Sequence, residues 1–230
     1  MLSRLGPLAP NATVFDVGCS TGYLLEDLRT LLPSGRLVGF DLIYSGLKKA
    51  SANIPNALIL QADACHLPTP DCSADVLVSA NLLEHVADDS EALAEFWRVL
   101  RPGSRAVIVV PLSPGTYDYY DRYLNHQRRY RHGELAEKAR NVGFTVIEDT
   151  FLCSIIYPAF WLVKKRNRLR CDHLTGPALK ERVSRDIAGT QDSPIFSVAC
   201  NLERWLRRHG IALPFGIRGL SVLERPSEGT

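Results

Sequence analysis

Short apolar runs alternate with stretches of helical periodicity along the first 150 residues of the chain. The runs are too short for helices and rich in β-branched residues, which predicts strands at 13–17, 36–41, 57–61, 75–79 and 105–110. Apolar residues at helical spacing predict helices at 22–32 and 89–100. Strands that alternate with helices favour a parallel sheet with right-handed crossovers.

The pattern changes after residue 110. A polar, aromatic stretch at 112–132 predicts a long functional loop. A helix at 133–142, ended by Gly143, and a strand at 144–150 follow.

The last third departs further from a simple strand–helix alternation. A polar, turn-prone stretch at 171–193 precedes an amphipathic helix at 194–209 and a last strand at 217–223. We therefore expect a core domain of residues 1–152 plus 215–226, and a helical insertion at 153–214 that forms a lid.

The turn after the first strand carries the first candidate chemistry. It reads D-x-G-x-S-x-G from Asp16 to Gly22, and its glycines favour a backbone that directs N–H groups at a ligand. Thr21 is the expected N-cap of the next helix. Asp16 adds a carboxylate, which suits an ammonium group better than a phosphate. A dinucleotide-binding turn would read G-x-G-x-x-G, which argues against NAD.

Polar residues follow the next three strands as well. Asp41 lies 23 positions after Gly18, where an acid accepts hydrogen bonds from ribose hydroxyls; the alternative is a cap for the helix that follows. Asp63 and Asn81 follow the third and fourth strands. The carboxyl ends of parallel strands meet at one edge of a sheet, so these groups are expected to share a crevice.

These residues resemble the class I S-adenosylmethionine-dependent methyltransferases. The family turn reads D/E-x-G-x-G-x-G, and Ser20 replaces its middle glycine, as a serine with ordinary backbone angles can. An acid after strand three, L-E-H at 83–85 and R-P-G at 101–103 are similar to the type 11 branch, as is the segment from His126 and Tyr130 to Gly143.

The resemblance implies an α/β fold: a Rossmann-like, seven-stranded, mostly parallel sheet of order 3-2-1-4-5-7-6 with helices on both faces and a C-terminal helical insertion. It implies S-adenosyl-L-methionine as cofactor and S-adenosyl-L-homocysteine as product. Asp16 and the turn would hold the methionine end, Asp63 would lie beside the adenine, and Asn81 and Leu82 would line the methyl-bearing side. The expected cofactor-binding residues are Asp16, Gly18, Cys19, Ser20, Gly22, Asp41, Leu42, Asp63, Ala64, Asn81 and Leu82.

A sulfonium methyl group is already activated, so a general base is needed only for a hydroxyl or a protonated amine. The candidates are His85, His126 and Tyr130, of which His85 has the alternative role of a helix cap. The Asn81-x-x-Glu84-His85 segment resembles a metal-binding segment of ubiquinone-pathway O-methyltransferases, but with fewer carboxylates, and no metal is expected.

Composition refines the choice of partner. The 230 residues carry a net charge of only +2, which gives no general case for nucleic-acid binding. Residues 1–100 hold 6 Lys+Arg against 12 Asp+Glu, and residues 101–230 hold 21 against 13. Six scattered cysteines without zinc spacing indicate reduced thiols, and no signal peptide is recognised, so we expect a cytoplasmic protein.

The segment 151–170 has two interpretations. It is either a lid helix with a solvated basic end, or an interfacial segment whose Phe160 and Trp161 enter a membrane while its Lys/Arg residues face anionic headgroups. The second would make the protein peripheral to the membrane and its acceptor lipid-linked.

The sequence therefore predicts methyl transfer from S-adenosylmethionine to a small-molecule or lipid-linked acceptor, at oxygen, by in-line displacement. The alternatives are a non-catalytic binding protein for the cofactor, a protein or RNA methyltransferase, and aminopropyl transfer or NAD chemistry on the same fold. The Asn/Asp-Pro-Pro-Tyr signature of amine methylation in nucleic acids is absent.

Overall fold

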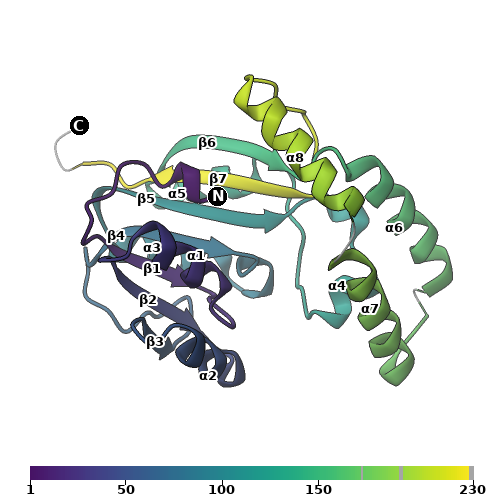
Figure 1. Cartoon of the computed structure of the whole chain (residues 1–230), viewed down its shortest axis with the longest axis horizontal. Helices are drawn as coiled ribbons and strands as arrows, with labels where there is room; N and C mark the ends of the chain where they lie inside the picture. Colours follow the sequence, from purple (N-terminus) through teal and green to yellow (C-terminus); the bar gives the residue numbers. More distant parts are fainter. Residues whose placement is uncertain (172, 192–193, 228–230) are drawn as a thin grey trace. The chain divides into compact units, whose positions relative to one another are not determined.

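The computed structural model describes residues 1–171, 173–191 and 194–227 (Figure 1). It divides into two compact units. The core unit comprises Met1–Val110, Gly133–Asp149 and Leu220–Thr230, and the helical unit comprises Pro111–His132 and Thr150–Gly219. The polar stretch after residue 110 therefore groups with the C-terminal helices. The lid role expected for 153–214 stays a prediction.

The sheet confirms the predicted topology. Its strands are β1 (Thr13–Val17), β2 (Arg36–Asp41), β3 (Leu58–Gln61), β4 (Ala74–Ala80), β5 (Leu100–Pro111), β6 (Thr145–Leu152) and β7 (Arg218–Glu224). They are ordered β3-β2-β1-β4-β5-β7-β6, with parallel pairing from β3 through β5. Three consecutive residues of β4, Val76 to Val78, are at most 1% exposed, as expected for a strand covered on both faces.

The last strand runs against its neighbours. Near the start of β5, the Gly103 N–H donates to the Arg225 carbonyl (2.7 Å). Just after β5 ends, the Leu112 N–H donates to the Ile217 carbonyl (2.9 Å). Because the partner number falls as the β5 number rises, β7 is antiparallel to β5, which agrees with the mostly parallel sheet that the resemblance implies.

The helices of the core unit follow the predicted stripes. They are α1 (Tyr23–Leu31), α2 (Tyr44–Asn53), α3 (Asp89–Val99), α5 (Glu134–Val142) and the short η1 (Leu2–Arg4) and η2 (Leu83–His85). The Asp88 side chain caps α3 by accepting from the backbone N–H groups of Ser90 and Glu91 (both 3.1 Å). Leu93 and Phe96 then bury the inner face of α3.

The helical unit holds more secondary structure than the sequence predicted. Its elements are η3 (Pro114–Thr116), α4 (Tyr119–Tyr123), α6 (Tyr157–Cys171), α7 (Gly176–Gln191) and α8 (Pro194–Arg208). The loop expected at 112–132 contains η3 and α4, because Asp118 and Asp121 form a capping box. The turn-prone stretch expected at 171–193 is mostly α7, apart from residues 172, 192 and 193, which lie outside the described residues.

A small apolar cluster anchors α7 in this unit. Tyr119, Cys171 and Val183 are buried together, and Leu174 and Leu179 pack around them. No helix in the described part of the chain is both long enough and apolar enough to cross a membrane.

Candidate cofactor site

Asp16 is the most unusual side chain at the carboxyl edge of the sheet. It lies in β1, is 1% exposed, and among the described residues its Oδ2 atom has no hydrogen-bond partner. Burial, with a smaller contribution from the Asp41 charge, raises the pKa of Asp16 to about 8. An unpaired buried acceptor costs about 1–3 kcal/mol, so the site favours a ligand that donates to this carboxylate and carries positive charge.

The turn after β1 uses its own N–H groups to hold β2. The N–H groups of Gly18 and Cys19 both donate to the Phe40 carbonyl (2.8 and 2.9 Å), and the Gly22 N–H donates to the Cys19 carbonyl (2.8 Å). The expectation that these amides point at the ligand is therefore wrong for Gly18, Cys19 and Gly22. Thr21 is also not the N-cap of α1; Gly22 takes that position without a side-chain bond.

The turn requires glycine at Gly18 for two reasons, its backbone angle and the close packing around it. Gly18 has φ 85°, and a Cβ atom built on it would lie 2.9 Å from the Cβ of Leu82, which follows β4. The loops after β1 and β4 therefore touch at this glycine. Ser20 has φ 48°, in the left-handed region, so the ordinary backbone angles expected for this serine are wrong.

Asp41 is not the N-cap of α2, a position that Ile43 occupies, and its contact with a ribose stays a prediction. Its Oδ2 accepts from the Ser20 N–H (2.9 Å) and its Oδ1 from the Ile43 N–H (2.8 Å), one residue before α2. It thus ties the turn after β1 to the end of β2. Each carboxylate oxygen keeps a further lone pair, which can accept from a ribose hydroxyl.

The remaining predicted contacts follow β2, β3 and β4. Leu42 is 61% exposed and is followed by two more exposed apolar residues, an apolar surface that can cover a base. Asp63 is exposed and accepts from the Cys65 N–H through Oδ1 (3.0 Å), while Ala64 beside it is buried. Asn81 adopts φ 55° and donates its N–H to the Val109 carbonyl (2.9 Å).

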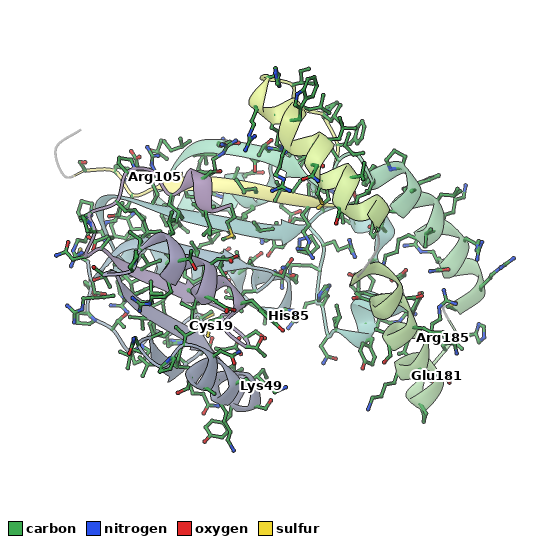
Figure 2. All side chains as sticks on the ribbon, in the orientation of Figure 1. Cys19, Lys49, His85, Arg105, Glu181 and Arg185 are labelled. Carbon is green, nitrogen blue, oxygen red and sulfur yellow. The ribbon has the colours of Figure 1, made fainter. Side chains whose placement is uncertain are left out.

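Two residues of β2 that the sequence analysis did not single out shape this site. Phe40 supplies the carbonyl that accepts hydrogen bonds from the turn. Gly39 leaves room for the turn, since a Cβ on Gly39 would lie 2.9 Å from the Cys19 sulfur. A glycine inside a buried strand marks close approach by a neighbour, so Gly39 was the available signal. Cys19 itself (Figure 2) is 5% exposed, and its thiol packs against β2.

The three candidates for the general base are divided between the units. His85 is exposed and ends η2 in the core unit (Figure 2), whereas His126 and Tyr130 belong to the helical unit. Tyr130 is fully buried, and its backbone bonds to Pro111 and Ser113 (2.9 and 3.0 Å).

His126 is held by a buried carboxylate. Its Nδ1 lies 2.9 Å from Oδ1 of Asp121, and the Arg129 Nε donates to the same oxygen (2.7 Å). Burial alone would raise the pKa of Asp121, but the His126 hydrogen bond and the Arg129 charge lower it well below its usual range. An ionised carboxylate can only accept a hydrogen bond, so Nδ1 is the ring nitrogen that donates to Asp121.

The strand order is that of the Rossmann-like fold found in class I methyltransferases, which use S-adenosylmethionine. Residues 15–108 match the family model for the type 11 methyltransferase domain. The orphaned, high-pKa carboxyl of Asp16 fits the ammonium of that cofactor.

Similar proteins agree with this assignment. The chain is 33% identical over 156 residues to a protein of Mycolicibacterium smegmatis named "probable S-adenosylmethionine-dependent methyltransferase", covering 64% of this chain and 57% of that one. It is 32% identical over 117 residues to a malonyl-[acyl-carrier protein] O-methyltransferase of Yersinia pestis, covering 51% and 43%. The chain thus spans about half the length of these curated relatives.

A solved structure shows the same fold. Phosphoethanolamine N-methyltransferase 2 of Haemonchus contortus, solved in complex with S-adenosyl-L-methionine, matches with a TM-score of 0.65 at 16% identity. The match covers 98% of this chain and 51% of that one.

Proposed function

We propose that the protein transfers a methyl group from S-adenosylmethionine to an oxygen atom of a small-molecule or lipid-linked acceptor. The observation that carries the proposal is the buried Asp16 carboxyl, which has an unpaired oxygen and a pKa near 8 at the end of β1. Such a group is stabilised when a cation binds beside it.

S-adenosylmethionine supplies a methyl group on a positively charged sulfur, which needs only an aligned acceptor. In our proposal Asp16 binds the ammonium, Asp41 accepts from the ribose and Asp63 from the adenine. Leu42 and Ala64 cover the base, and Asn81 and Leu82 line the side where the acceptor enters. The amides of the turn position Asp41 and Phe40 rather than the ligand.

Methylation at a hydroxyl oxygen is the form of transfer that needs a general base. We assign that role to His126, whose Nδ1 lies 2.9 Å from the ionised Asp121. The name of the Yersinia pestis relative also refers to oxygen methylation.

Titration calorimetry with S-adenosylmethionine, S-adenosylhomocysteine and NAD tests the cofactor. We expect binding of the first two and none of NAD; the reverse would overturn the proposal. Transfer of labelled methyl groups to an extract of small metabolites and lipids tests turnover, and cofactor binding without any labelled product would mean a binding protein.

His126→Gln tests the base. We expect cofactor affinity to stay unchanged and transfer to fall about 10²–10⁴-fold. The control is His209→Gln at the end of α8, where the ring contacts the Trp205 carbonyl (2.8 Å), and full activity is expected. Equal activity in both variants would remove the base from the proposal.

A lipid-linked acceptor is supported by one surface of α6. Leu162 and Val163 are 63% and 54% exposed, immediately before a run of Lys and Arg residues. We expect the protein to co-sediment with anionic vesicles and the double variant Leu162→Ser/Val163→Ser to sediment less. Absence of sedimentation for the unaltered protein would leave a soluble small molecule as the acceptor.

A further inference from the structure

The helical unit contains a cavity of about 210 Å³ between η3 and α6. Its lining combines three cationic side chains with one indole: Gly115, Thr116, Trp161, Lys164, Lys165 and Arg168. Pockets for whole drug-sized ligands are about 300–1,000 Å³, so this cavity suits a small head group.

The cationic wall is built by the periodicity of one helix. The four lining residues of α6 fall at positions i, i+3, i+4 and i+7, which share one helix face. Like charges at this spacing repel one another, so the face is stabilised when an anion binds to it.

Lys164 belongs to the protein's own framework. Its Nζ lies 2.6 Å from Oδ1 of Asp118 and 3.7 Å from Oδ2 of Asp121, and its side chain is only 11% exposed. Its charge is therefore balanced inside the unit, and it forms the floor of the cavity rather than a free cation.

The charges of Lys165 and Arg168 are not balanced in this way. The Lys165 Nζ lies 5.1 Å from the centre of the Trp161 ring, and within the described residues it has no acidic partner. The Arg168 Nη2 donates to the Tyr117 carbonyl (2.7 Å), a neutral acceptor that holds the guanidinium in place, and no carboxylate of the described part of the chain pairs with it.

Two uncompensated positive charges suit an anion whose negative charge has about the same magnitude. A phosphate monoester carries about −1.5 to −2 at pH 7, and the planar guanidinium matches its oxygen atoms. The opposite wall is open, since a Cβ on Gly115 would meet nothing within 4 Å. The cavity thus has room for oxygen atoms beside the backbone of η3.

We propose that this cavity binds the phosphate group of a ligand, held by Lys165 and Arg168 and flanked by Trp161. The phosphate can come from a soluble phosphorylated molecule or from a lipid headgroup. This inference goes beyond the proposed methyl transfer and does not depend on it.

Titration with pyrophosphate, followed by calorimetry and by tryptophan fluorescence, tests the soluble source. The pocket variant is Lys165→Gln/Arg168→Gln. The control is Arg166→Gln/Arg170→Gln, which removes the same charge from the same helix at residues outside the lining. We expect the pocket variant to lose at least about tenfold in affinity and the control less than about twofold, because charge-assisted hydrogen bonds require contact.

Vesicles of phosphatidylcholine with and without phosphatidic acid test the lipid source with the same two variants. Loss of binding specific to the pocket variant supports the proposal in either assay and identifies the source. The proposal would be overturned by equal losses in both variants or by no binding in either assay. It would also be overturned if malonate, a dianion without phosphorus, bound as tightly as pyrophosphate. Cofactor calorimetry is independent of these outcomes, so failure here is distinguishable from failure of the proposed function.

Discussion

The two units of the chain carry opposite excesses of charge: the core unit is acidic and the helical unit is basic. By sequence the core unit holds 11 Lys+Arg against 18 Asp+Glu, and the helical unit holds 16 against 7. The core unit buries consecutive apolar residues such as Val76 to Val78, whereas the helical unit buries Asp118, Asp121 and Arg129. The core unit also buries Asp16 and Asp89, so the difference is one of proportion: apolar burial dominates the core unit, and ion pairs contribute more to the described part of the helical unit.

The largest effect is expected from Gly18→Arg in the core unit. The substitution strains a backbone at φ 85° and drives a side chain into Leu82, so we expect calorimetry to detect no cofactor binding. Circular dichroism should show an unchanged fold. Gly133→Arg is the matched control, because Gly133 has φ 83° but open space around its Cβ position, and it should bind normally.

The substitution Asp121→Asn tests whether the buried ion pairs stabilise the helical unit. The change breaks the buried ion pair with Arg129, while Lys164 keeps its closer partner Asp118, and it should lower the free energy of unfolding by about 3–5 kcal/mol.

The control for this variant is Glu181→Gln. Glu181 pairs with Arg185 on α7 (2.7 Å; Figure 2), but both side chains are about 70% exposed, so we expect a change below about 0.5 kcal/mol. Denaturant unfolding measures both variants. Equal effects would mean that burial does not distinguish these ion pairs.

The raised pKa of Asp16 in the core unit predicts that cofactor binding releases a proton. Since Asp16 has a pKa of about 8, it is mostly protonated at pH 7, and binding of an ammonium should release about one proton. Calorimetry in buffers of different ionisation enthalpy measures this release, which should vanish in Asp16→Asn. If the unaltered protein releases no proton, the ammonium lies elsewhere.

The same shift sets the pH dependence of folding stability. A carboxyl with a raised pKa in the folded state contributes stability below its unfolded pKa, near 4, and loses that contribution as pH rises through about 8. Unfolding of the free protein followed between pH 5 and pH 8 should show this decline, and Asp16→Asn should flatten it.

The smallest effect is expected from Ser20→Gly. Glycine removes the strain of a side chain at φ 48° and should raise the free energy of unfolding by about 1 kcal/mol. The control Ser45→Gly lies inside α2, where glycine costs about 0.5–1 kcal/mol, so thermal unfolding should shift in the opposite direction.

The sequence predicted the core unit well because its signals are local. Apolar runs located the strands, and the acids at their ends marked the carboxyl edge where Asp16 and Asp41 lie. The use of the turn amides was not predictable, because the Phe40 carbonyl that accepts them comes from another strand.

The helical unit was predicted less well for the same physical reason. Among the residues of α7 whose burial is described, Val183 is the one fully buried apolar residue, and the helix also makes contacts such as the Tyr119 hydroxyl donating to Asp186 (2.5 Å). Those partners lie 67 positions apart, so the helix could not be predicted from a periodic pattern of apolar residues in its own sequence. The capping box of α4, by contrast, was readable from the spacing of Asp118 and Asp121.

The packing of Cys19 beneath the turn has a chemical consequence. Burial and the nearby carboxylates of Asp16 and Asp41 raise the pKa of its thiol to about 12, so the reactive thiolate is almost absent at neutral pH. Alkylating reagents and oxidants therefore encounter an inert sulfur as long as the loop stays folded over β2. The thiol becomes a natural reporter, modified only when the crevice opens.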